Sequence, residues 1–188
     1  MSQVIKDNLE TILGELRLAL RRIDNGESEC FRELLLEVPG VFVVGAGRSG
    51  LMVRAFAMRL RHLGLPVSVV GDILARPIQP GDLLVVASGS GETGSLVAIA
   101  RKARELGASL ALLTANPAST LADLSDCTVV FDAPTPKAPI APGVESAQPM
   151  GSLFEQALFL FLESTIMDLM RQTGQDSSIM SQRHANLE

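Results

Sequence analysis

The chain has 188 residues, of which 47% are hydrophobic and only 4% aromatic, with neither tryptophan nor tyrosine. One domain holds about 150 residues on average, so we expect a single domain over residues 1–188 with an aliphatic core. The formal net charge is −5 at pH 7. That balance argues against the cationic surface on which nucleic-acid binding depends, so we expect no nucleic-acid partner.

We also expect no membrane partner and a cytoplasmic location. The longest apolar run, residues 153–170, is interrupted by three acidic residues and falls short of the roughly 18–20 apolar residues of a membrane span. The first residues lack the apolar core of a signal peptide. Cys30 and Cys127 are far apart in the sequence, which is typical of free thiols rather than of a disulfide framework.

Hydrophobic periodicity indicates an α/β protein, with N-terminal helices followed by a doubly wound, mainly parallel sheet of five strands flanked by helices. We expect helices over 3–24 and 27–37, then a strand over 41–44, a helix over 49–63, strands over 67–70 and 83–87, a helix over 93–106, a strand over 109–113, a short helix near 120–124, a strand over 127–131 and a last helix over 153–170. The strands are continuous aliphatic runs, as expected where helices cover both faces of a sheet.

The segment 133–149 contains five of the ten prolines and breaks this periodicity, which predicts a loop before the last helix. Two interpretations stay open. The loop is either a lid over a site or a rigid surface connection, because long loops need no catalytic role to exist.

Two glycine-rich turns, GAGRSG at 45–50 and SGSGETG at 88–94, each follow an expected strand and open an expected helix. Ligands bind at this carboxyl edge of open α/β sheets. In the second turn, glycines let the backbone approach an anion, and the helix start offers unpaired N–H groups. The hydroxyls of Ser88, Ser90 and Thr93 add neutral donors beside the Gly91 backbone. This turn predicts a phosphate site that needs no lysine.

The first turn also satisfies the dinucleotide-binding pattern G-x-G-x-x-G, and Asp72 follows the next strand about where a ribose-binding acid would lie. A Rossmann cofactor site is therefore an alternative. It is disfavoured because the second turn is the better anion cradle and no substrate domain remains. The glycines also have a plain packing interpretation. Arg48, flanked by Gly47 and Ser49, either contacts a sugar hydroxyl or phosphate or is simply solvated.

The loop SGSGET at 88–93 resembles the phosphosugar loop of the sugar isomerase (SIS) domain family, and four further segments resemble the 6-phospho-3-hexuloisomerases within it. These are GAGRSG at 45–50, FAMRL with HLG at 56–64, MGSLFE at 150–155 and the ending RHANLE. The resemblance implies interconversion of D-arabino-3-hexulose 6-phosphate and fructose 6-phosphate through a 2,3-enediol, in formaldehyde assimilation. It further implies a 3-hexulose-6-phosphate synthase as pathway neighbour. The apolar helices expected over 3–24 and 153–170 predict a homodimer or homotetramer, and we expect no cofactor.

The supply of residues favours a carboxylate base, because no lysine lies near the glycine turns and two histidines with two distant cysteines do not form a metal site. Glu155 is the best candidate, although Ser152 and Glu155 also fit a capping box. The resemblance makes His184 a second acid or base, from its own or a neighbouring subunit; otherwise it belongs to a frayed tail. Arg59 and His62 are further possible site residues or a packed pair. Glu92 is expected to face the start of its own helix.

Two other functions remain alternatives. A phosphosugar-sensing SIS module would use the same loop without turnover, but such a sensor is usually joined to an output domain, for which this chain has no room. A nucleotide-binding Rossmann protein would require tight NAD binding.

Overall fold

Five parallel strands form one sheet in the computed structural model, which describes residues 1–135 and 145–187. They are β1 (Val41–Gly45), β2 (Val67–Val69), β3 (Leu83–Ala87), β4 (Ser109–Thr114) and β5 (Cys127–Val130), in the order β2-β1-β3-β4-β5. Every neighbouring pair is parallel. The expected doubly wound α/β architecture is confirmed.

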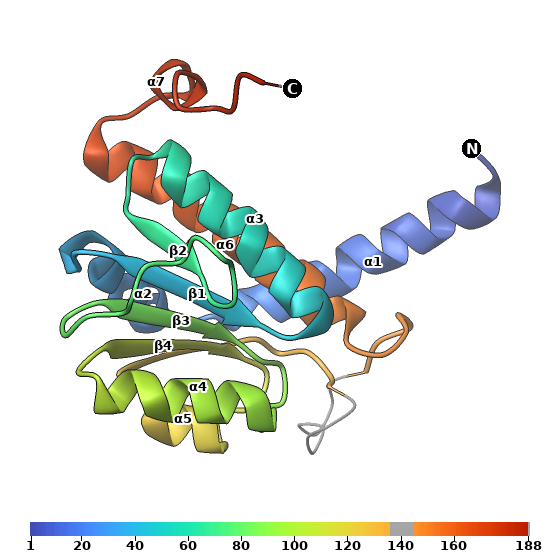
Figure 1. Ribbon diagram of the computed structural model, residues 1–188. Helices are drawn as coiled ribbons and strands as arrows, with labels where there is room; N and C mark the ends of the chain where they lie inside the picture. Colours follow the sequence, from blue (N-terminus) through green and yellow to red (C-terminus); the bar gives the residue numbers. More distant parts are fainter. Residues whose placement is uncertain (136–144, 188) are drawn as a thin grey trace.

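Helices cover both faces of this sheet (Figure 1). One face packs against α1 (Gln3–Arg21), α2 (Asn25–Glu37), α3 (Gly47–His62) and α6 (Ser152–Thr173), and the other packs against α4 (Gly94–Glu105) and α5 (Thr120–Leu124). A short helix, α7 (Ser177–Ser181), follows α6. Among the described residues, no helix is both long and apolar enough to cross a bilayer.

Alternation along the strands divides the core into two layers. Val41 and Val43 pack on the side of α1, α2, α3 and α6, whereas Phe42 and Val44 pack on the side of α4 and α5. Successive strand side chains point to opposite faces, so a strand covered on both faces must be apolar at every position. This explains why the strands read as uninterrupted aliphatic runs.

Several helix boundaries differ from the expectation by one to three residues, and one helix was not predicted; caps explain the start of α2 and the addition of α7. The side chain of Asp24 accepts a hydrogen bond from the Gly26 N–H at 2.7 Å, so α2 begins at Asn25. Helix α7 was not predicted. Gly174 ends α6 in the left-handed conformation, with φ 66°, and Asp176 then caps α7 by accepting from two backbone N–H groups.

The loop expected over 133–149 is described only in part, and residues 136–144, on which the lid interpretation depends, lie outside the described residues. Its final portion is held by Glu15 of α1. The carboxylate accepts hydrogen bonds from Ser146 Oγ at 2.7 Å, Ala147 N at 2.7 Å and Gln148 Nε2 at 2.9 Å. Burial raises the pKa of Glu15, but these bonds outweigh it and the pKa lies below its ordinary value. Helix α1 thus anchors the segment that leads into α6.

Candidate functional site

The two glycine-rich turns lie side by side because β1 and β3 are neighbours and Gly45 is the register partner of Ala87. Together with the start of α6 they enclose a pocket of about 480 Å³. Helices α3, α4 and α6 all begin at this pocket, which therefore faces three helix N-termini. Seven expected site residues line it: Gly47, Arg48, Ser49, Ser88, Ser90, Thr93 and Glu155.

Close packing accounts for the glycines of the first turn. A Cβ on Gly50 would lie 2.6 Å from the carbonyl oxygen of Gly45, too close for any side chain. Asp72 does not reach the pocket; it pairs with Arg54 at 3.0 Å on another surface. The dinucleotide pattern is thus explained by the close approach of strand and helix, and its expected acidic residue is engaged elsewhere.

The second turn arranges hydroxyls around the start of α4. Ser88 Oγ accepts a hydrogen bond from the Gly91 N–H at 3.2 Å and lies 3.5 Å from Thr93 Oγ1. Ser90 Oγ accepts from the Glu92 N–H at 3.3 Å. Thr93 is the N-cap of α4, yet its side chain makes no capping hydrogen bond. The first N–H groups of α4 are therefore left for an anion from the pocket.

The segment after β4 supports this loop from behind, a contact that was not predicted. Thr114 Oγ1 donates to Gly89 O at 3.2 Å, and Asn116 Nδ2 donates to Ser90 O at 3.0 Å. Thr114 and Asn116 are polar residues at the carboxyl end of β4, and their position in the sequence could have predicted a contact with this edge of the sheet. These bonds fix the backbone on which the hydroxyls stand.

The expectation for Glu92 was wrong in one respect: its carboxylate caps a different helix. It accepts hydrogen bonds from Thr120 N at 2.6 Å and Thr120 Oγ1 at 2.9 Å, at the start of α5. These bonds lower the pKa of Glu92 below its ordinary value. The carboxylate thereby ties the loop to α5, and Glu92 is not among the residues that line the pocket.

Replacing Gly91 by alanine should damage the loop, whereas the same change at Gly94 should not. Gly91 has φ 67°, and a Cβ there would overlap Ser119 Oγ, which caps α5. We expect Gly91→Ala to lower the free energy of unfolding by more than about 1–2 kcal/mol. A Cβ on Gly94, which opens α4, would meet no atom within 4 Å, so Gly94→Ala should be neutral or slightly stabilising. Urea unfolding of both variants tests this; equal effects would contradict the packing explanation.

Glu155 lies in the first turn of α6 with a side chain that is 16% exposed. The capping box expected as an alternative is not formed, because the N-cap is Gly151 and no side chain caps the helix. The carboxylate instead pairs with Arg48, whose Nε lies 2.5 Å from Glu155 Oε2. Arg48 and Glu155 are the one cation and the one anion among the described residues that line this pocket.

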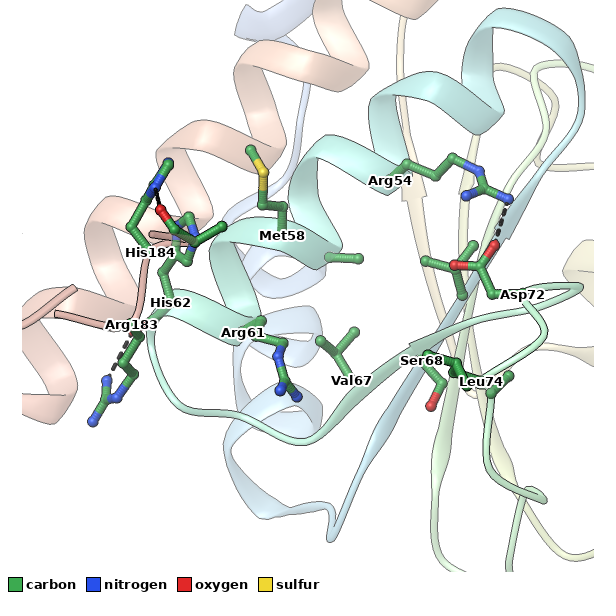
Figure 2. A pocket seen from close by; sticks show the side chains of 14 residues that line it. Arg54, Met58, Arg61, His62, Val67, Ser68, Asp72, Leu74, Arg183 and His184 are labelled. Carbon is green, nitrogen blue, oxygen red and sulfur yellow. Dashed lines mark hydrogen bonds and ion pairs between the residues drawn. The ribbon is translucent and has the colours of Figure 1, made fainter. Parts of the chain in front are cut away.

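His184, His62 and Arg59 lie away from this pocket. The rings of His62 and His184 are 5.1 Å apart, and both residues line a second pocket of about 820 Å³ beside β2 (Figure 2). His62 is buried, and burial lowers its pKa, assisted by the charges of Arg59 and His184. Arg183 donates to His62 O at 2.8 Å and to Gln175 Oε1 at 2.7 Å, so it holds the C-terminal segment against α3.

Within one chain, His184 and Glu155 are therefore separated. The two pockets share no lining residue, and His184 packs near Ile166. From Glu155 to Ile166 is roughly 16 Å along α6 at the helical rise per residue. Across residues 1–135 and 145–187, no group of three or more His, Cys, Asp or Glu side chains is placed to hold a metal ion.

Comparison with known proteins places the chain in a family. The SIS domain matches residues 34–160. A 3-hexulose-6-phosphate isomerase from Bacillus subtilis (strain 168) is 44% identical over 177 residues, covering 94% of this chain and 95% of the relative. One from Mycobacterium gastri is 41% identical over 184 residues, covering 98% of this chain and 92% of the relative.

A solved structure agrees with the relatives. The crystal structure of a hypothetical protein from Methanococcus jannaschii, which infers a molecular function of 3-hexulose-6-phosphate isomerase, has a TM-score of 0.82 at 26% identity and covers 97% of this chain and 99% of that one. The resemblance expected from the glycine turns and the α6 start is confirmed. The chain belongs to the SIS domain family, in the group that includes the 3-hexulose-6-phosphate isomerases.

Proposed function

We propose that this chain is an isomerase that interconverts D-arabino-3-hexulose 6-phosphate and fructose 6-phosphate. The observation that carries the proposal is the pocket itself, where a hydroxyl-lined anion loop and a partly buried carboxylate, Glu155, face the same space. A sensor would need the loop alone. An isomerase also needs a base, and relatives at 44% and 41% identity are named as isomerases of this substrate.

The chemistry follows from the substrate. A base takes the proton from C2, the electron pair forms the C2–C3 double bond, and the C3 carbonyl oxygen gains a proton to give the enediol. The proton on O2 then leaves as the C2 carbonyl forms, and a proton returns to C3. Since phosphate blocks O6, the 3-ketose cannot close a five-membered ring, so it arrives open. Fructose 6-phosphate closes through O5, and only the reverse direction requires ring opening.

We assign the C2–C3 proton transfer to Glu155, since it is the carboxylate that lines the pocket. The phosphate is assigned to Ser88, Ser90, Thr93 and the Gly91 backbone, with Gly47 and Ser49 at the neighbouring turn. No step is assigned to Arg59 or His62, which line other surfaces.

We further propose that the protein is a homo-oligomer, a dimer or tetramer, in which residues 1–188 form one domain. The first half of α1 extends beyond the sheet and the other helices (Figure 1). Helix α1 exposes a row of apolar side chains, with Val4 66%, Leu9 43% and Leu13 54% exposed. A short helix without packing is marginal in water, which favours a second copy as its cover.

Light scattering at micromolar concentration should report a dimer or tetramer. Replacing both Leu9 and Leu13 by glutamate should lower the measured mass, because charges would be buried in the contact. Glu10→Gln, an exposed position of the same helix, serves as the control and should leave the mass unchanged. A monomer at this concentration would overturn the proposal, and so would an unchanged mass for the double variant.

Ser90→Ala should weaken phosphosugar binding by about 10- to 150-fold, the range for loss of a charged hydrogen bond of about 1.5–3 kcal/mol. Calorimetric titration with fructose 6-phosphate measures it. Ser95→Ala, at an exposed position in the first turn of α4, is the matched control. Unchanged affinity in a Ser88, Ser90 and Thr93 triple alanine variant would remove the phosphate loop from the proposal.

Incubation with fructose 6-phosphate in heavy water tests the function directly. NMR should show deuterium entering C3 of fructose 6-phosphate and C2 of the hexulose product, as a shared 2,3-enediol requires. Absence of both exchange and product would leave the sensing alternative.

The proposal also includes a cytoplasmic setting, supported by the free thiols Cys30 and Cys127, and a synthase of 3-hexulose 6-phosphate as the upstream enzyme.

A further inference from the structure

The ion pair between Arg48 and Glu155 presents a difficulty for the proposed chemistry. Arg48 Nε lies 2.5 Å from Glu155 Oε2, so the carboxylate oxygen that would take a proton from carbon is already in contact with a cation. The pair also lies at the pocket, where a substrate must enter. In the empty pocket, therefore, the base is occupied by the nearest cation.

A phosphosugar changes the charge balance of this pocket. It brings up to two negative charges, whereas the described lining residues include a single cation, Arg48. Arg48 stands three residues after Gly45, and Ser88 directly follows Ala87, the register partner of Gly45 on the adjacent strand. Adjacent strands lie about 5 Å apart, so the guanidinium and the phosphate loop start from neighbouring backbone positions.

The side chain of Arg48 has the freedom to change partners. It is 60% exposed and is held through Nε, whereas Glu155 is 16% exposed and sits on a fixed helical turn. A long exposed arginine moves at less cost than a carboxylate on a packed helix. The guanidinium is also suited to phosphate, because its planar fork binds two oxygens at once.

We propose that Arg48 makes catalysis depend on the phosphate: it pairs with Glu155 in the empty pocket, moves to the phosphate of a bound phosphosugar, and so frees Glu155 to accept the proton. This inference rests on the proposed function for the identity of the substrate. Arg48 is then a specificity-determining, positioning residue. An unphosphorylated ketose, which cannot attract the guanidinium, leaves the base paired.

NMR of protein labelled with ¹⁵N-arginine tests the exchange of partners. The Nε–H signal of Arg48, identified by its loss in Arg48→Gln, should shift when saturating inorganic phosphate or fructose 6-phosphate is added, and should not shift with unphosphorylated fructose. In Glu155→Gln the signal should already differ without ligand. A signal that inorganic phosphate leaves unmoved, or that fructose moves as far as fructose 6-phosphate does, overturns the proposal.

Kinetics on fructose 6-phosphate provide the second readout. We expect Arg48→Gln to raise KM by about 10- to 100-fold, the range for one charged hydrogen bond, with a smaller change in kcat because the base is already free. Arg48→Lys should restore most of the affinity. Arg54, which is 51% exposed on the same helix, pairs with Asp72 away from the pocket; Arg54→Gln is the control and should change neither constant.

The outcomes separate the two proposals. A wild-type protein that shows the NMR shift but no isomerisation contradicts the proposed function and leaves the phosphate-driven movement of Arg48 in place. The other outcome is normal turnover by the wild type together with an Arg48→Gln variant in which kcat falls by the same factor as kcat/KM. That result contradicts only the role proposed for Arg48.

Discussion

Glu155→Gln should lower the rate of isomerisation by about 10⁴-fold, the upper end of the effect of a general base. The substitution keeps the shape of the side chain and removes the group that takes the proton. Exchange of solvent deuterium into the sugar should fall in parallel. Affinity for fructose 6-phosphate should stay near that of the parent, since we assign the phosphate to the loop at the start of α4.

Glu163→Gln is the matched control for this result. Glu163 lies on the same helix, two turns further along, and lines a pocket with His62 and His184 instead of the phosphate loop. It should retain full activity. If Glu155→Gln still exchanges deuterium at the parent rate, the carboxylate only pairs with Arg48 and the base must be sought at another residue.

Mixing two inactive variants should restore activity if His184 works in the site of a neighbouring subunit. Alone, Glu155→Gln should lose about 10⁴-fold in rate and His184→Ala about 10²- to 10⁴-fold. After the subunits are mixed in equal amounts and allowed to exchange, about a quarter of the sites would combine an intact Glu155 with an intact His184 from another copy. Activity should rise to about a quarter of the parent's, measured by coupled assay.

The separation of the two residues within one chain motivates this experiment, since α6 places roughly 16 Å between Glu155 and the region of His184. The control mixes Glu155→Gln with a double variant that carries both changes, which can form no complete site. Failure of the single variants to complement, with subunit exchange verified by mass spectrometry, would confine His184 to packing against His62.

The architecture and the turn that lines the pocket were predictable from the sequence because both depend on local patterns. The aliphatic runs identified each strand, and the glycine and hydroxyl spacing at 88–94 identified the turn, whose role in binding phosphate stays a prediction. Side-chain contacts between residues distant in the sequence could not be predicted. The bond from Asn116 to Ser90 spans 26 residues, and the Arg48 to Glu155 pair spans more than a hundred. Such contacts depend on how the strand ends meet, which no short motif encodes.

Glu155 also shows how a local motif can mislead. Ser152 and Glu155 have capping-box spacing, yet Gly151 takes the N-cap position and the carboxylate turns to Arg48. A capping motif describes the hydrogen bonds that one helix start can form by itself. In the folded chain, an arginine from another helix competes for the same carboxylate oxygens. In the same way, the dinucleotide pattern at 45–50 reflected close packing of β1 on α3.

The meeting of three helix starts at one pocket also determines how the protein responds to alkaline conditions. Peptide dipoles and backbone N–H groups carry no titratable proton, whereas a lysine-based anion site loses its charge near about pH 10. Attraction for a sugar phosphate should therefore persist undiminished well above neutrality. On the acid side it should weaken only when the phosphate itself takes up a proton, near about pH 6. The protonation of the ligand, rather than that of any group in the loop, should therefore set the acid limit of phosphate binding.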